Sequence, residues 1–250
     1  MKKAMSICIL LVLFTSTTGI AMAIPANDNS KADEHNPVIT VVDPVHGIAK
    51  AEFIHYDKKH QKKIVTSSIV PGSGTCWSTF ATWNNNLPVS YVINPTNSQG
   101  LSSSFIASTI STSAETWDNA TSRELFRNTY GTDSRAKYGK YDGKNSIVFG
   151  GLNPGTIAIT STWFYTTTRQ IVEFDMKLNT YYTWGNADLN PRLMDLSNIV
   201  THELGHGIGM NDIYEASCAD VTMYGYGDFG ETNKRTLDPL DIEGLLSVYP

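Results

Sequence analysis

Apolar residues after position 100 recur at the spacing of helix faces in three places. In residues 102–121 they return every three to four positions, which is the period of one helix face. Residues 195–207 show the same period, and Asp195 is a suitable N-cap for that helix. A third helix is predicted to begin at Asp238, because Pro239 favours the first helical position.

Short runs rich in β-branched and aromatic residues predict strands elsewhere in the chain. Gly, Pro or Asn residues, which favour turns, separate these runs. The predicted strands cover residues 38–42, 64–70, 88–93, 146–149, 156–165 and 170–178. The order is strand, helix and then several strands, and the first helix is expected to bury one face on the sheet.

The first 23 residues have the pattern of a secretory signal peptide. Lys2 and Lys3 precede an apolar run over residues 4–14, and a small-residue cleavage pattern follows at residues 21–23. An uncleaved membrane anchor is the alternative, but a span needs about 20 apolar residues and this run has only about ten. Cleavage after Ala23 and secretion are therefore predicted, with no membrane span afterwards.

Composition and charge narrow the classes of function. The chain of 250 residues is 41% hydrophobic and 17% charged, so it can bury a core. Its formal charge is −5, which argues against a nucleic-acid partner because phosphate binding needs a clustered basic face. Of three cysteines, Cys8 falls in the signal peptide, which leaves Cys76 and Cys218 as a possible disulfide pair in an exported protein.

Residues 24–75 differ from the rest of the chain. They begin with a polar stretch, and Pro71-Gly72-Ser73-Gly74 has the composition of a linker. This segment also contains a cluster of basic residues, which is interpreted as a solvated turn, with a processing site as the alternative. The cluster comprises Lys58, Lys59, His60, Lys62 and Lys63. We therefore expect residues 24–75 to be an N-terminal pro-segment or extension and residues 76–250 to form the main domain.

The strongest chemical signal is the pattern His202-Glu203-x-x-His206 in the second predicted helix. Histidines four positions apart share a helix face and suit two nitrogen ligands of tetrahedral zinc. Glu203 can reach a water on the metal and take its proton. Gly209 permits a sharp exit from the helix, which positions Asp212 as a third ligand. Three ligands leave the fourth position to water, as in catalytic zinc sites.

No histidine after residue 60 competes with this pair, since the other four are His35, His46, His55 and His60. A distant glutamate, Glu231, is the alternative third ligand, but Gly209 and Asp212 would then have no role. A closed structural zinc site would require more Cys or His.

The sequence resembles the metzincin metallopeptidases, whose signature is H-E-x-x-H-x-x-G-x-x-H or -D followed by a turn containing methionine. Met223 stands eleven residues after Asp212, where the family places a tight turn beneath zinc. Residues 87–249 resemble a matrixin-type catalytic domain. The resemblance implies an α+β fold with a twisted, mostly parallel five-stranded sheet, three helices and a zinc cleft along an edge strand, assigned to residues 156–165.

The resemblance also implies a secreted, zinc-dependent endopeptidase. A protein or peptide substrate would add to the edge strand as an extended strand. Zinc would activate water, and Glu203 would act as the general base of peptide-bond hydrolysis. The alternative is a non-catalytic extracellular binding module that retains the metalloprotease fold. The presence of Glu203 argues against that alternative, because holding the metal does not require this carboxylate.

The sequence departs from the family pattern at its metal ligands. Asp212 stands where histidine is more common, as in some smaller bacterial and archaeal-type members. Matrixins often hold a second zinc between strands, but residues 130–145 contain no histidine, so one zinc is predicted. Asp133 and Asp142 could hold calcium, although a solvated loop is favoured.

Two further features bear on regulation and on the cleft. Many matrixins are inhibited by a pro-segment cysteine bound to zinc, but the surroundings of Cys76 do not resemble that motif, and a disulfide with Cys218 is favoured. Tyr224 and Tyr226 follow Met223, but neither stands at the position of the oxyanion-stabilising tyrosine of some metzincins, so wall or packing roles are expected.

Overall fold

The computed structural model describes residues 37–60, 76–84 and 86–250. The predicted signal peptide, the strand at 64–70 and the linker at 71–74 lie outside the described residues. Among the described helices, none has both the length and the apolar character that crossing a bilayer requires.

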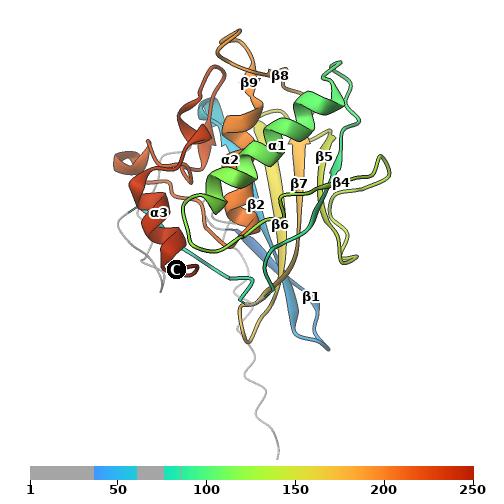
Figure 1. Ribbon diagram of the computed structural model, residues 1–250, viewed down its shortest axis with the longest axis vertical. Coiled ribbons are helices and arrows are strands. Elements are labelled where there is room, and N and C mark those ends of the chain that lie inside the picture. The colour runs from blue at the N-terminus through green and yellow to red at the C-terminus, as the bar shows by residue number, and fades with distance from the viewer. Residues whose placement is uncertain (1–36, 61–75, 85) are drawn as a thin grey trace, which may run out of the picture. The chain divides into compact units, whose positions relative to one another are not determined.

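A mixed sheet forms the framework of the fold (Figure 1). Its strands are β1 (Val38–Asp43), β2 (Ile48–Asp57), β3 (Tyr91–Asn94), β4 (Gly131–Thr132), β5 (Asn145–Gly150), β6 (Thr156–Tyr165), β7 (Ile171–Asn179) and β10 (Tyr226–Gly227). They lie in the order β1-β2-β6-β7-β5-β3-β4, with β10 beside β2. From β4 to β7 neighbouring strands are parallel, and β6 is antiparallel to β7. Within this eight-stranded sheet, the five neighbouring strands β6, β7, β5, β3 and β4 correspond to the mostly parallel five-stranded sheet that the family resemblance implies.

The helices begin where their capping residues predict. α1 (Ser103–Asp118) and α2 (Leu196–Gly207) lie across the same face of the sheet, and α3 (Pro239–Leu246) lies near the C-terminus (Figure 1). The side chain of Asp195 accepts a hydrogen bond from the amide of Asn198 and caps α2. A capping box begins α3 at Asp238. A two-stranded sheet of β8 (Trp184–Gly185) and β9 (Met194–Asp195) precedes α2.

β2 is a strand that the hydrophobic pattern did not lead us to predict. It runs antiparallel to β6, from Ile48 opposite Tyr165 to Tyr56 opposite Thr156. Residues 156–165 do form a strand, but our assignment of this strand to the open edge of the sheet is wrong, because β2 covers it. In the sequence, the signal is the alternation of apolar Ala49, Ala51 and Phe53 with charged Lys50 and Glu52. In the structure the apolar residues are buried and the charged residues are partly exposed.

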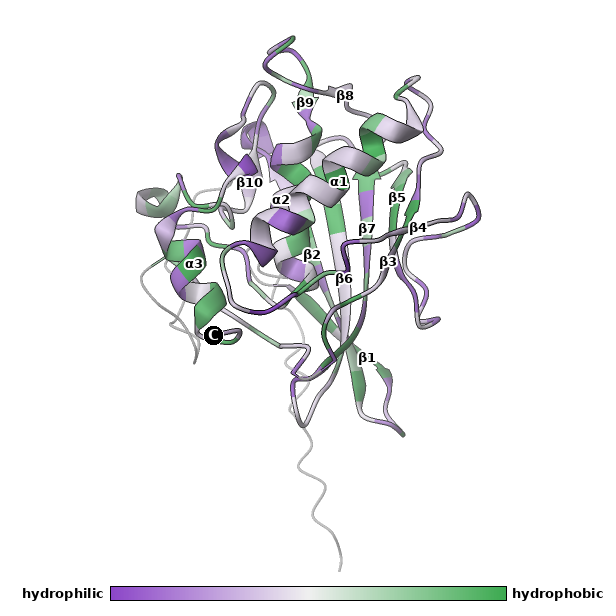
Figure 2. Ribbon diagram, viewed as in Figure 1, coloured by the Kyte–Doolittle hydropathy of each residue, from purple (hydrophilic) through white to green (hydrophobic). Residues whose placement is uncertain are grey.

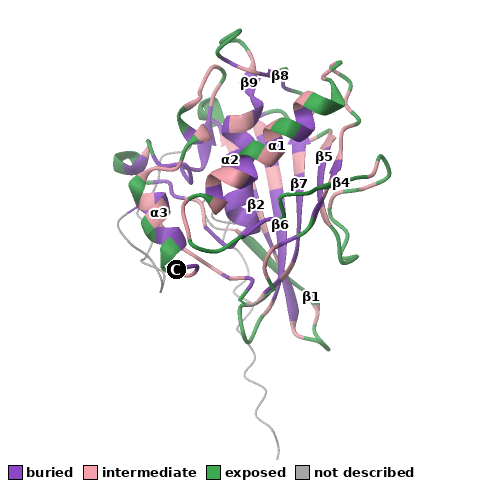
Figure 3. Ribbon diagram, viewed as in Figure 1, coloured by how far each residue is buried: buried purple, intermediate pink, exposed green. Residues whose placement is uncertain are grey.

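The core lies between α1, α2 and the sheet, where Figure 3 shows most of the buried residues. The indole of Trp117 donates to the carbonyl of Thr201 at 2.8 Å and joins α1 to α2. In contrast, β1 is mostly exposed although it is apolar (Figures 2 and 3).

A disulfide joins Cys76 to Cys218, which are separated by 142 residues. Cys218 belongs to a short 3-10 helix, η2 (Ala216–Cys218), that follows Asp212. The disulfide therefore ties residue 76 to the loop that carries the predicted third ligand.

Candidate metal centre

His202, His206 and Asp212 bring three ligand atoms together, as the sequence predicts. The Nε2 atoms of His202 and His206 are 3.1 Å apart. Asp212 Oδ1 lies 3.1 Å from His202 Nε2 and 3.4 Å from His206 Nε2. The histidine side chains are completely buried, and the Asp212 side chain is only 4% exposed. This spacing allows all three atoms to reach one metal ion.

The hydrogen bonds of the two imidazoles determine which nitrogen faces the centre. His202 Nδ1 lies 2.7 Å from the carbonyl oxygen of Thr222, and His206 Nδ1 lies 2.9 Å from that of Met210. Because a carbonyl oxygen only accepts, each Nδ1 carries a hydrogen and each neutral ring turns its Nε2 lone pair inward. Asp212 Oδ1 faces these lone pairs, and no hydrogen-bond donor among the described residues contacts this oxygen. Three converging acceptors fit a cation, and two nitrogens with one oxygen suit zinc.

The charges of these groups fit the same conclusion. Burial lowers the pKa of His202 to about 4, so its ring is neutral at physiological pH. Burial alone would raise the pKa of Asp212, but the positive charge of His206 in its protonated form, which Asp212 in turn favours, holds the pKa of Asp212 well below its usual range. The centre thus offers a neutral imidazole and an ionised carboxylate to a cation.

Gly209 allows the chain to leave α2 and return to the centre. Its φ is +99°, and a Cβ at this position would lie 1.9 Å from the carbonyl oxygen of Ala81. Only glycine combines this backbone angle with so close an approach. The amide of Met210 then bonds back to the carbonyl of Gly205 at 2.9 Å, and the reversed chain carries Asp212 towards the histidines.

Met223 lies against the ligand helix, as the family pattern implies. A Cβ on Gly205 would lie 2.3 Å from Met223 Sδ, so helix and methionine pack without a gap. The carboxylate of Asp241 accepts hydrogen bonds from the amides of Thr222 and Met223, at 2.7 and 3.1 Å. Because the Thr222 carbonyl orients His202, α3 supports the centre through this turn.

Glu203 lies beside the ligands and is completely buried. Its Oε2 accepts a hydrogen bond of 2.5 Å from the hydroxyl of Thr160 on β6. Its Oε1 lies 3.3 Å from Nδ1 of His55. Burial raises the pKa of Glu203 to about 7. A carboxyl group with such a pKa can both accept and release a proton near neutral pH.

β2 covers the centre with two aromatic rings. The Phe53 ring stacks on His206 with centroids 4.1 Å apart, and the His55 ring lies 4.0 Å from that of His202. His55, His202 and Glu203 form a second group of potential metal ligands. His55 is not among the site residues predicted from the sequence, because that prediction takes only histidines after residue 60 as companions of the motif pair. The sequence signal for a buried His55 is its place in the alternating pattern of β2, where it falls on the same face as the buried Phe53.

The other residues singled out in the sequence do not join the ligand set. Asp133 and Asp142 belong to no group of converging ligands among the described residues, so calcium has no support here. Glu231 forms an ion pair with Lys58 instead of facing the histidines. Cys76 is held in the disulfide.

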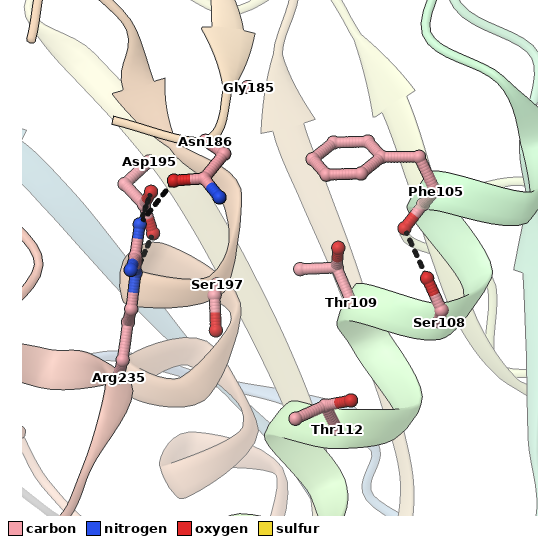
Figure 4. Close-up of a pocket in the computed structure, with 9 residues that line it drawn as sticks. All are labelled: Phe105, Ser108, Thr109, Thr112, Gly185, Asn186, Asp195, Ser197 and Arg235. Atoms are coloured by element: carbon pink, nitrogen blue, oxygen red, sulfur yellow. Dashed lines mark hydrogen bonds and ion pairs between the residues drawn. The ribbon is translucent and has the colours of Figure 1, made fainter. Parts of the chain in front are cut away.

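A hollow of about 270 Å³ lies elsewhere, between α1 and the start of α2 (Figure 4). Arg235 and Asp195 pair at 2.5 Å on one side of it, and threonines of α1 line the other. None of the three metal-ligand candidates lines this hollow. It is separate from the candidate centre.

The fold and the ligand geometry define the metzincin class: a mixed sheet, a His-Glu-x-x-His helix and a methionine turn packed against it. The sequence pattern of the peptidase M10 family, described as Matrixin, matches residues 82–250. The chain belongs to the matrixin family, which indicates a zinc metallopeptidase. No curated protein in the comparison matches the chain.

Replacing Tyr214 with Phe is expected to weaken zinc binding about 10-fold to 100-fold, because partners that orient a ligand tune metal affinity. The Tyr214 hydroxyl donates to Asp212 Oδ2 at 3.0 Å. Competition with a chelating dye measures the affinity. The matched control is Tyr138→Phe, whose lost hydroxyl contacts Ser161 instead. Equal affinities in the two variants would contradict the prediction.

Proposed function

We propose that the protein is a secreted zinc endopeptidase whose N-terminal segment closes the cleft until it is displaced. The observation that carries the proposal is the convergence of two imidazole nitrogens and the Asp212 carboxylate beside the buried carboxylate of Glu203. Membership of the matrixin family supports the same chemistry.

His202, His206 and Asp212 would hold the zinc ion. When bound, zinc supplies Lewis-acid polarisation of the substrate carbonyl and lowers the pKa of water. Glu203 accepts the proton of the attacking water and delivers it to the nitrogen of the broken peptide bond. Thr160 fixes the carboxylate for this task through its 2.5 Å hydrogen bond. The Thr222 and Met210 carbonyls keep both imidazoles in the orientation that the ligands require.

The substrate would bind as an extended strand along β6. β2 already pairs with this side of β6, so β6 offers the backbone groups that such a strand needs. A substrate and β2 cannot use this side of β6 together. Residues 24–75, which contain β2, therefore act as a pro-segment in this proposal, and residues 76–250 as the catalytic domain.

Secretion is supported by two observations. The sequence begins with a signal-peptide pattern, and the disulfide between Cys76 and Cys218 suits an oxidising compartment. Protein substrates outside the cell, including those of an extracellular matrix, are then the expected targets.

Metal analysis and proteolysis of residues 24–250 test this proposal. We expect about one zinc per chain, together with hydrolysis of casein or gelatin that a chelator abolishes and zinc restores. Limited tryptic cleavage at Lys62 or Lys63 should increase the hydrolysis, since it separates β2 from the main domain. A chain without zinc would refute the ligand set. A zinc-bound chain that stays inactive after this cleavage would favour the non-catalytic binding module.

Replacing Phe53 with Ala is expected to increase peptide hydrolysis by the full chain up to about 100-fold. Phe53 is 1% exposed, and truncating a buried Phe destabilises a packed structure by about 3 kcal/mol or more. Because Phe53 is buried only while β2 is bound, the substitution mainly destabilises the closed state and raises the fraction of open molecules. Initial rates on a fluorogenic peptide measure the increase. The control is Ile54→Ala, because Ile54 lies on the opposite face of β2 and is only partly buried. Unchanged rates in Phe53→Ala would argue against closure by β2.

A further inference from the structure

β2 lies at the candidate centre in the manner of a bound peptide. It is antiparallel to β6 and parallel to β10, so its backbone is held from both sides. Tyr56 pairs with Tyr226, directly after the segment that crosses the ligand histidines. A substrate that replaces β2 meets the same two neighbours and is expected to run in the same direction.

The contacts of β2 also indicate which peptide bond takes the position of the broken bond. The Phe53 ring stacks on His206 and the His55 ring lies tilted against His202, so the backbone between residues 53 and 55 spans the metal ligands. Glu203, which delivers the proton to the leaving nitrogen, contacts His55. The amide nitrogen of His55 thus corresponds to the leaving nitrogen, and the His55 side chain occupies the place of the residue that follows the cut.

A buried lysine lies at the inner end of the space that His55 fills. Lys234, in the short 3-10 helix η3 (Asn233–Arg235), is 1% exposed. Its Nζ donates to the carbonyls of Tyr224 and Tyr226 and lies 3.3 Å from His55 Nε2. All three acceptors are neutral. Two are backbone carbonyls, and the third is the lone pair on Nε2 of a His55 ring that carries its hydrogen on Nδ1, facing Glu203.

The ammonium group of Lys234 remains a cation under ordinary conditions. Burial lowers the pKa of Lys234 to about 8, against the opposing effect of the more distant carboxylates of Glu231, Asp212 and Glu203, and most of the group is still charged at pH 7. When β2 leaves, the donor that faced His55 points into the space for the substrate side chain. A buried cation with one donor free for the substrate gains most from an anionic acceptor.

We propose that Lys234 selects substrates with glutamate directly after the cut bond. This inference rests on the proposed peptidase function. The carboxylate oxygen of glutamate and the Nε2 of histidine stand the same number of bonds from Cα, so glutamate can reach the position where His55 meets Lys234. Leucine fills similar space but leaves the ammonium donor unpaired. Sites built to bind a polar group discriminate strongly against analogues that lack it.

The test uses the zinc-loaded full chain and two fluorogenic peptides that differ only in Glu or Leu after the cut. Closure by β2 lowers kcat/KM for both peptides by the same factor, because both require the same open state, so the ratio of the two values is independent of closure. We expect kcat/KM for the Glu peptide to exceed that for the Leu peptide at least tenfold. A ratio at or below one in the unmodified chain would overturn the proposal.

Variants connect the preference to Lys234. In Lys234→Met the ratio should fall below one while the Leu peptide is still cut, and Lys234→Arg should retain a preference for Glu. The control is Lys177→Met on β7, which removes an ammonium group that lies 4.5 Å above the Tyr138 ring. An unchanged ratio in Lys234→Met would overturn the proposal. Cleavage of the Leu peptide also shows that the variant folds.

A binding measurement separates this inference from the peptidase proposal. Fluorescence anisotropy of both peptides with the zinc-loaded Glu203→Gln full chain reports affinity without turnover. Tighter binding of the Glu peptide supports the role of Lys234 even if the unmodified chain cuts neither peptide, a result that would refute only the peptidase function. Equal affinities would refute the role of Lys234.

Discussion

Glu203→Gln is expected to reduce peptide hydrolysis by about 10³-fold, because general-base catalysis contributes about 10²-fold to 10⁴-fold. The amide can still accept the hydrogen bond from Thr160 and fill the same space, but it cannot take the proton of the attacking water. Zinc should remain bound at the stoichiometry of the unmodified chain, since the three ligands are untouched. Steady-state hydrolysis and metal analysis of the same preparation measure both quantities.

The matched control is Glu173→Gln on β7. Glu173 is also completely buried, but its carboxylate accepts from the backbone amides of Asp142 and Gly143 and does not face the ligands. This variant should retain most of the activity. A Glu203→Gln chain that keeps more than about a tenth of the normal rate would exclude Glu203 as the general base. Loss of zinc from that chain would instead show that Glu203 supports the ligands.

Removing the disulfide with Cys76→Ser and Cys218→Ser is expected to lower the free energy of unfolding by about 5 kcal/mol. The cross-link closes a loop of 142 residues, and the loop-entropy relation gives this magnitude for that length. Urea unfolding at saturating zinc measures the change. Reduction of the unmodified chain with a phosphine should reproduce it.

The disulfide should also affect the metal centre. Residues next to Cys76 brace the loop that carries Asp212, because the amide of Asn211 donates to the carbonyl of Ser78 at 2.8 Å. The same variant is therefore expected to bind zinc more weakly in dye competition. A loss of less than about 1 kcal/mol in unfolding, with unchanged zinc affinity, would contradict both expectations.

Features with a local cause could be predicted from the sequence. The N-caps of α2 and α3 depend on residues within one turn of the helix start. The chain reversal after α2 depends on Gly209, whose backbone angle other residues rarely adopt. The predicted ligands are brought together because this reversal and the helical spacing of the histidines act over a few residues.

Features that depend on distant partners could not be predicted in this way. β2 is stabilised by pairing with β6, about 100 residues later, and its small and charged residues give a weak hydrophobic pattern. The burial of Lys234 is likewise invisible in the sequence, where a lysine is expected on the surface. His55 and Lys234 meet because β2 and the loop after the methionine turn converge on α2.

The position of Cys76 has a consequence for the way in which β2 can leave. The disulfide lies after residues 61–75, so a backbone cut in that connection leaves β2 with no covalent link to the main domain. In the proposed closed state, the covalent connection before the cut would give β2 an effective concentration at β6 on the order of millimolar, regardless of how dilute the protein is. After the cut, β2 is an ordinary ligand at the concentration of the protein itself. In the proposed mode of closure, dilution would then raise the fraction of molecules whose cleft is open, and a high local concentration of the protein would keep it closed.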